Sequence, residues 1–306
     1  MITRKILKRR LITLLSCLLL FSQITFAEAL TELPKEDFAE NITYFTKTLE
    51  NLPNSFNGFK IVHLSDYHNQ LYELDPILFI KKIKELNPDI IVLTGDIIDP
   101  EAIEVLPKSF ADYESVKWMN SLLEIAPVYY IYGNNDTFKD EAIQADYEKY
   151  LKELGISLLK ESSVLIERQE ESIELVGISD PVFLKKMGKN EKEQVEASLD
   201  KAFKGTSIDG VKILLAHRPE FIELYSKYKP QLVLSGHTHG GQARSKSGIP
   251  YVGIPGQEKP IYIDGLYNVF GTSMIVNRGL GTSQIPIRIN CPPEIGVITL
   301  KCPKTK

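Results

Sequence analysis

Cysteine is scarce in this chain of 306 residues, which contains three cysteines and five histidines. Cys17 lies in an apolar N-terminal stretch, while Cys291 and Cys302 flank a predicted strand at 294–300. That strand would extend about 20 Å, whereas a disulfide needs Cα atoms about 4.4–6.8 Å apart. We therefore expect no disulfide between them, unless the tail folds straight back, and no catalytic role for either thiol.

Positive charge is limited as well. The formal net charge is −4, and residues 1–27 carry five positive and no negative charges, so the remainder carries −9. No stripe of lysine and arginine is present of the kind that nucleic-acid-binding surfaces need. The chain also lacks internal repeats and low-complexity stretches. These absences exclude nucleic acid as an expected partner and indicate a single globular domain, which we expect to be a monomer.

The N-terminal residues have the pattern of a secretory signal peptide. Basic residues at positions 4, 5, 8, 9 and 10 precede a mostly apolar stretch, 11–24, and Ala27 and Ala29 offer small residues for cleavage. The stretch is short for a membrane span, which needs about 20 residues, although an uncleaved anchor is the alternative. We expect a signal peptide or membrane anchor at 1–27, a polar linker at 28–40 and the folded domain at 41–306. The protein is then exported or membrane-associated in the cell envelope.

Four of the five histidines lie in short polar motifs, and each motif follows an apolar run that predicts a buried strand. Metal ligands on the tips of neighbouring strands can converge on one point, which scattered polar residues would not do. The predicted strands are 61–64, 90–93, 128–132, 213–215 and 232–234. The ligand candidates that follow them are Asp66, His68, Asp96, Asn134, His217, His237 and His239.

The donor types narrow the choice of metal. Carboxylate, imidazole and amide donors without a thiolate suit Mn, Zn or Fe. Two such ions about 3.5–4 Å apart share one ligand, usually a carboxylate. Asp96 stands in the middle of the order and is the candidate bridge. The sequence therefore predicts a site for two divalent metal ions.

Other polar residues near these motifs have alternative interpretations. His63 lies inside an apolar strand and is expected to be structural. Asp99 is either a ligand or outer-shell group, or it starts a turn before Pro100. Asp136 and Thr238 are expected to orient the site rather than to bind metal.

Taken in order, the motifs resemble those of the calcineurin-like metallophosphoesterases. That family's pattern runs D-x-H, G-D, G-N-H-[DE], a lone His and G-H-x-H, and the resemblance extends from about Phe38 to the end of the chain. It implies a hydrolase that uses a metal-bridging hydroxide. It also implies that Asp66, His68, Asp96 and His239 hold one metal, and that Asp96, Asn134, His217 and His237 hold the other.

The segments between the motifs predict alternating helices and strands. Helices are expected at 76–86, with Asp75 as the N-cap and Pro76 first, and at 115–125, 141–154, 191–203 and 219–227. Further strands are expected at 163–167, 173–177, 266–270, 274–277 and 294–300. This order indicates an α/β protein with two packed sheets. The resembled family has a four-layer α/β/β/α sandwich of two mixed β-sheets flanked by helices.

Asn135 departs from the family pattern, which has histidine at that place. Asparagine donates hydrogen bonds but cannot give up a proton near neutral pH. The departure leaves the ligand Asn134 in place and puts general-acid catalysis in doubt. Asp99 likewise stands where purple acid phosphatases have a tyrosine ligand, which argues against a tyrosinate–iron site.

Within the family, the chain looks most like the bacterial YkuE/YaeI-type phosphodiesterases. This resemblance rests on segments 64–66, 216–220, 277–281, 286–288 and 292–295. It implies a phosphodiester or pyrophosphate substrate, and some such enzymes act on UDP-2,3-diacylglucosamine in lipid A synthesis. Arg278 and Arg288 are candidate phosphate clamps, or else surface ion-pair partners. The alternative function is an exported non-catalytic metal-binding or envelope-binding protein, which Asn135 motivates.

Overall fold

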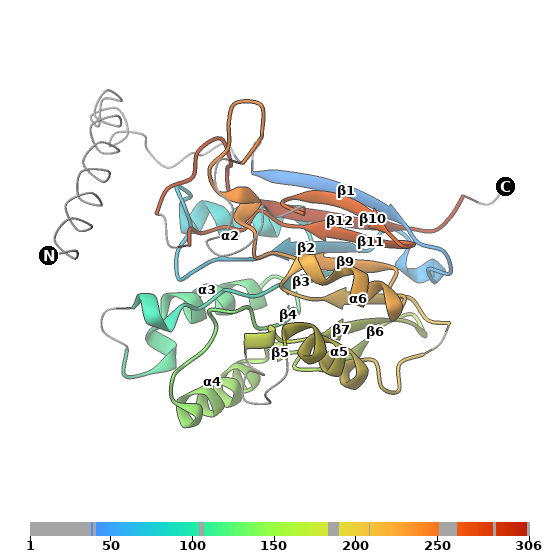
Figure 1. The fold of residues 1–306 in the computed structure, drawn as a ribbon, viewed down its shortest axis with the longest axis horizontal. Helices are drawn as coiled ribbons and strands as arrows, with labels where there is room; N and C mark the ends of the chain where they lie inside the picture. Colours follow the sequence, from blue (N-terminus) through green and yellow to red (C-terminus); the bar gives the residue numbers. More distant parts are fainter. Residues whose placement is uncertain are drawn as a thin grey trace, which may run out of the picture. The chain divides into compact units, whose positions relative to one another are not determined.

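Two six-stranded β-sheets form the centre of the structure, which is a computed structural model of the chain (Figure 1). Sheet A has the order β1 (Ile42–Thr48), β12 (Ile295–Lys301), β2 (Lys60–Leu64), β3 (Ile90–Leu93), β4 (Val128–Tyr130) and β5 (Ser157–Leu158). Sheet B has the order β10 (Gly265–Val269), β11 (Thr272–Val276), β9 (Leu232–Ser235), β8 (Lys212–Leu215), β7 (Glu171–Gly177) and β6 (Ser162–Arg168). Each sheet has parallel inner pairs and at least one antiparallel pair, so both sheets are mixed, as predicted.

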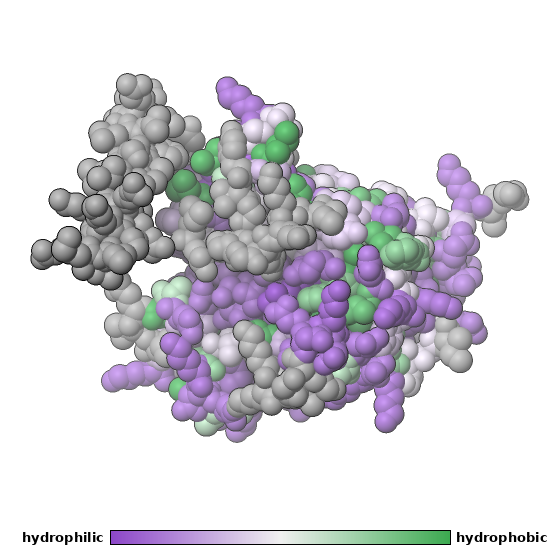
Figure 2. Space-filling view, viewed as in Figure 1, coloured by the Kyte–Doolittle hydropathy of each residue, from purple (hydrophilic) through white to green (hydrophobic). Residues whose placement is uncertain are grey.

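The structure describes residues 38, 41–103, 107–182, 190–207, 209–250, 262–283 and 286–304. These residues belong to one compact unit, Asp37–Lys306. The predicted signal peptide or anchor, and nearly all of the predicted linker, lie outside the described residues. Within the described ranges, no helix is both long and apolar enough to cross a membrane. The face shown in Figure 2 is mainly hydrophilic, with apolar residues in small groups.

Five α-helices in the described ranges complete the unit, and each coincides with a predicted helix to within a few residues. They are α2 (Pro76–Leu86), α3 (Glu114–Leu123), α4 (Glu141–Leu154), α5 (Glu191–Ala202) and α6 (Ile222–Lys227). The start of α2 shows why the prediction succeeds. The Asp75 carboxylate accepts hydrogen bonds from the backbone N–H groups of Ile77 and Leu78, and Pro76 occupies the first helical position.

Alternation along the strands divides the core into three layers. In β3, Ile91 and Leu93 pack in the cluster that also contains buried residues of α2, α3 and α4. Ile90 and Val92 point to the opposite face and pack between the two sheets. In sheet B, Leu214 packs with the helices α5 and α6. One hydrophobic layer lies between the helices and sheet A, the second between the two sheets, and the third between sheet B and its helices. They confirm the predicted α/β/β/α architecture.

The structure also differs from the predicted elements in several places. Strands β1 and β5 were not predicted, because β1 is a half-exposed edge strand and β5 has only two residues. The strand predicted at 128–132 ends at Tyr130. The helix predicted at 219–227 divides into a 3₁₀ turn, η5 (Pro219–Phe221), and α6. Cys291 and Cys302 are both free, in agreement with the prediction.

Candidate metal centre

The predicted ligands meet at the carboxyl ends of five strands. Strands β2, β3 and β4 are parallel neighbours in sheet A, and β8 and β9 are parallel neighbours in sheet B. Each of these five strands leads directly into one predicted motif. Because the carboxyl ends of parallel strands lie at one edge of a sheet, the motifs of both sheets face the same region.

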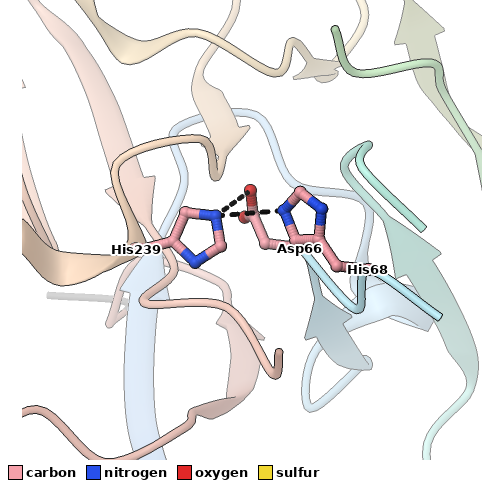
Figure 3. Close-up of side chains that lie close together, drawn as sticks. All are labelled: Asp66, His68 and His239. Atoms are coloured by element: carbon pink, nitrogen blue, oxygen red, sulfur yellow. Dashed lines mark hydrogen bonds and ion pairs between the residues drawn. The ribbon is translucent and has the colours of Figure 1, made fainter. Parts of the chain in front are cut away.

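Asp66, His68 and His239 form the first cluster of ligand atoms (Figure 3). The Nε2 atoms of His68 and His239 lie 3.1 Å apart, and Nε2 of His239 lies 3.4 Å from Oδ1 of Asp66. All three residues are buried. Two imidazole nitrogens and a carboxylate oxygen directed at one point are a donor set that a divalent cation can fill.

Asp96, His217 and His237 form the second cluster. Nε2 of His217, Nε2 of His237 and Oδ1 of the neighbouring Asn134 are all buried without a hydrogen-bond partner. Buried polar atoms seldom lack partners, so three of them in adjacent motifs require an explanation. A cation bound by these atoms provides one.

Asp96 lies between the two clusters. Its Oδ2 atom is 3.6 Å from Nε2 of His68 in the first cluster and 3.4 Å from Nε2 of His217 in the second. The side chain is buried, with 3 % of its surface exposed. This placement suits the bridging role that the sequence predicts for Asp96.

The backbone at the candidate ligands is unusual. Asp66, His68, Asp96, His237 and His239 all have positive φ angles, between 46° and 71°. Non-glycine residues seldom adopt this left-handed conformation, and clusters of such residues occur at functional sites. Gly236 allows two of the loops to approach, because a Cβ atom there would clash with the side chains of Ser65 and Asp66.

Asp136 links the loop that follows β3 to the loop that follows β4. Its carboxylate accepts hydrogen bonds from the backbone N–H groups of Asp96, Ile97, Ile98 and Gly133, at 2.6–2.9 Å. The hydroxyl of Tyr130 donates to the same carboxylate. Asp136 is fully buried and belongs to neither ligand cluster. Its contacts are those of a residue that positions Asp96.

Asn135 contacts the candidate bridge directly. Its backbone N–H donates to Oδ1 of Asp96, and its side-chain Nδ2 donates to Oδ2, each at 2.8 Å. The family's histidine at this position would not offer the same amide donor. Asn135 therefore acts here on the carboxylate that lies between the two clusters.

The two candidate phosphate clamps differ in their surroundings. The buried guanidinium of Arg288 donates to the backbone oxygens of Gly281, Arg278 and Cys291, and its Nη2 lies 3.4 Å from Nδ1 of His239. Arg278 donates to the oxygen of Pro292 and lies 3.4 Å from the carboxylate of Glu294. Arg288 is therefore engaged mainly with backbone oxygens, whereas Arg278 is engaged mainly with acidic partners and one carbonyl.

The residues with alternative interpretations lie close to the clusters. His63 is fully buried in β2, and its Nε2 pairs with Oγ1 of Thr94 at 2.8 Å. Burial lowers the pKa of His63 to about 3. Asp99 caps the short 3₁₀ turn η2 (Pro100–Ala102), and its Oδ2 lies 3.7 Å from Nδ1 of His68. Asp99 thus starts a turn and also faces a candidate ligand from outside the cluster.

The protonation of three of the candidate ligand histidines depends on burial and on nearby charge. Burial, together with neighbouring positive charges, lowers the pKa of His237 and of His239 well below 6.5, so both rings are neutral, the form that binds metal. Burial acts in the same direction on His217, but the carboxylates of Asp96 and Asp66 raise its pKa to about 10. A cation entering the second cluster must therefore displace a proton.

We expect the metal-free protein to lose stability as the pH rises from 6.5 toward 10. The folded pKa of His217 lies above its ordinary 6.5, so its proton stabilises the fold fully below pH 6.5 and is lost as the pH passes about 10. A bound cation replaces the proton, so the metal-bound protein should keep its midpoint of thermal unfolding over this pH range. Thermal unfolding over this range, with EDTA or with Mn²⁺, measures both effects. His217→Gln is the control, and an equal decline in the metal-free variant would contradict the assignment.

Several residues in the neighbourhood of the site were not among the predicted site residues. The backbone oxygen of Thr94 lies 2.7 Å from Nδ1 of His217, which leaves Nε2 free for a cation. The side chain of Asn277 donates to the oxygen of His63 and accepts from the N–H of Gly279, which packs against Asp66. Asn277 is the last residue of the predicted strand 274–277 and directly follows β11, so the pattern of a strand followed by polar residues could have found it.

Comparisons with known proteins agree with this geometry. The family described as calcineurin-like phosphoesterase matches residues 59–241. The chain is 33 % identical, over 82 % of each chain, to a protein of Bacillus subtilis named uncharacterized metallophosphoesterase YkuE. It is 30 % identical to phosphodiesterase YaeI of Escherichia coli, over 79 % of this chain and 82 % of that one. It is also 32 % identical to a transmembrane protein with metallophosphoesterase domain from Danio rerio, and covers 55 % of that protein.

Proposed function

Because the chain belongs to the calcineurin-like phosphoesterase family, we propose that it is a phosphodiesterase that depends on two divalent metal ions, Mn, Zn or Fe. The observation that carries the proposal is the position of Asp96, whose Oδ2 atom faces both ligand clusters at 3.4–3.6 Å. Relatives at 30–33 % identity are named metallophosphoesterase and phosphodiesterase, which supports the reaction class.

Asp66, His68 and His239 would hold one cation, and Asn134, His217 and His237 the other, with Asp96 between them. Two such ions, when bound, activate water and stabilise the charge that develops on a phosphate. Asp136 keeps the loops of Asp96 and Gly133 together, so the clusters keep their spacing. Thr94 keeps the proton of neutral His217 on Nδ1, away from the cation.

Asn135 limits which substrates the proposed site can hydrolyse. It cannot protonate a leaving oxygen, and its backbone N–H and its side-chain Nδ2 each donate to Asp96. We therefore propose substrates whose leaving groups need no proton, such as pyrophosphate linkages. An envelope pyrophosphate of the UDP-2,3-diacylglucosamine kind fits this requirement. Arg278 and Arg288 are the proposed phosphate clamps, and Arg278→Met should raise KM without changing metal content.

We also propose that residues 1–27 act as a signal peptide or membrane anchor, that 28–40 form a linker, and that 41–306 form the catalytic domain. Five basic residues before the apolar stretch 11–24 support export. The relative from Danio rerio is named a transmembrane protein, which agrees with an association with membranes. Cell fractionation that recovers the full-length chain in the soluble cytoplasm would rule out this proposal.

Hydrolysis of bis(p-nitrophenyl) phosphate by the full-length chain tests the activity. The protein is stripped with EDTA and then assayed alone and with Mn²⁺, Zn²⁺ or Fe²⁺. We expect turnover only with metal. The second candidate function, a non-catalytic metal-binding or envelope-binding protein, is favoured if the chain binds two cations and hydrolyses neither this ester nor a pyrophosphate.

A further inference from the structure

The second cluster takes its ligands from both sheets. Asn134 follows β4 of sheet A, and His217 follows β8 of sheet B. The two loops therefore belong to different layers, and their spacing depends on how the sheets are fixed to each other. Asp180, which lies just after β7, contacts both loops.

The contacts of Asp180 are specific on each side. Its backbone N–H donates to the oxygen of Tyr132, two residues before Asn134, at 3.0 Å. Its carboxylate accepts from Nε of Arg218 at 2.6 Å and from Nη2 at 3.2 Å. Arg218 directly follows His217. The Asp180 side chain is fully buried, and 12 % of the Arg218 side chain is exposed.

The surrounding packing keeps this junction in place. Gly177, at the end of β7, lies against sheet A, since a Cβ atom there would come within 2.8 Å of the Ile131 side chain. The hydroxyl of Tyr225 donates to the backbone oxygen of Arg218 at 2.7 Å. The Arg218 main chain is thus held from the helix side while its guanidinium is held by Asp180.

We propose that the buried Asp180–Arg218 pair is a positioning device that sets the spacing between Asn134 and His217, and through it the affinity of the second cluster for its cation. A two-bond pair between a guanidinium and a carboxylate fixes direction as well as distance. The inference rests on the proposed function, because it concerns the same metal centre.

Arg218→Lys tests the pair, because lysine keeps the charge but cannot form the two-bond arrangement. We expect the second Mn²⁺ to bind about 10- to 100-fold more weakly, as is typical when a partner of a ligand is lost. The Mn²⁺ ion of the first cluster should bind as tightly as in the wild type. Calorimetric titration of the EDTA-stripped full-length chain with Mn²⁺ measures both affinities. At saturating Mn²⁺ the kcat of the variant should recover.

Asp180→Asn is the second variant and should show the same selective loss. Arg168→Lys is the matched control, since Arg168 forms a half-exposed pair with Asp89 at 3.0 Å, outside the clusters. If both site variants lower the unfolding midpoint but bind two Mn²⁺ ions as tightly as the wild type, the pair only supports the fold and the inference is wrong. If the wild type itself binds no cation, the proposed function fails instead.

Discussion

Asp96→Asn is expected to abolish hydrolysis and to weaken the binding of both cations together. The carboxylate of Asp96 lies within 3.6 Å of a ligand nitrogen in each cluster. Asparagine keeps the shape but loses the negative charge that the two cations share. A loss of several kcal/mol of charge stabilisation corresponds to a rate decrease of about 10³-fold or more.

Two measurements check this result. Metal analysis after reconstitution should find two ions per chain in the wild type and fewer than one in Asp96→Asn. Turnover of bis(p-nitrophenyl) phosphate should fall together with the metal content. Asp140→Asn is the matched control, because Asp140 caps α4 and belongs to neither ligand cluster, and asparagine also caps helices. An active Asp96→Asn enzyme with two bound metals would refute the bridging role.

Asn135→His is expected to change which esters the protein hydrolyses. The wild type has no proton donor at this position, so aryl esters and pyrophosphates should be hydrolysed far better than alkyl diesters. A histidine there adds a general acid, which typically contributes about 10²–10⁴-fold. The variant should therefore hydrolyse alkyl diesters about 10²-fold faster than the wild type, whereas the rate for aryl esters should change little.

A series of diesters with leaving groups of increasing pKa measures the effect as kcat/KM. Asn135→Ala is the control, because it removes the amide that donates to Asp96 without adding an acid. Alanine should slow every ester by a similar factor. If the wild type and Asn135→His show equal sensitivity to the leaving group, another group supplies the proton and the interpretation of Asn135 is wrong.

The sequence predicted the elements that carry strong local signals. Continuous apolar runs such as 90–93 are buried on both faces, so their composition alone identifies them as inner strands. The start of α2 carries its own cap in Asp75. The half-exposed β1 has no such signal, because its place is fixed by pairing with β12, some 250 residues away in the chain.

The same distinction applies to the site. The candidate ligands follow strands and could be recognised by residue type and order. The contacts of Asp180 could not, because Asp180 meets Tyr132 only when the two sheets pack together and meets Arg218 only when β7 and β8 pair in sheet B. The two donors of Asn135 to Asp96 likewise depend on how the loops of β3 and β4 approach each other.

The strand order of sheet A has a consequence for how the chain acquires its structure. β12, the last strand, lies between β1 and β2, the first two, and pairs with both. The sheet thus has a gap between β1 and β2 that residues 295–301 fill. During synthesis from the N-terminus, β1 and β2 emerge before β12 and keep unpaired edges, which are sites of aggregation. Without residues 295–301, β1 and β2 would have no strand between them and sheet A could not form completely. A truncated chain should therefore be degraded by proteases rather than persist as a weaker enzyme.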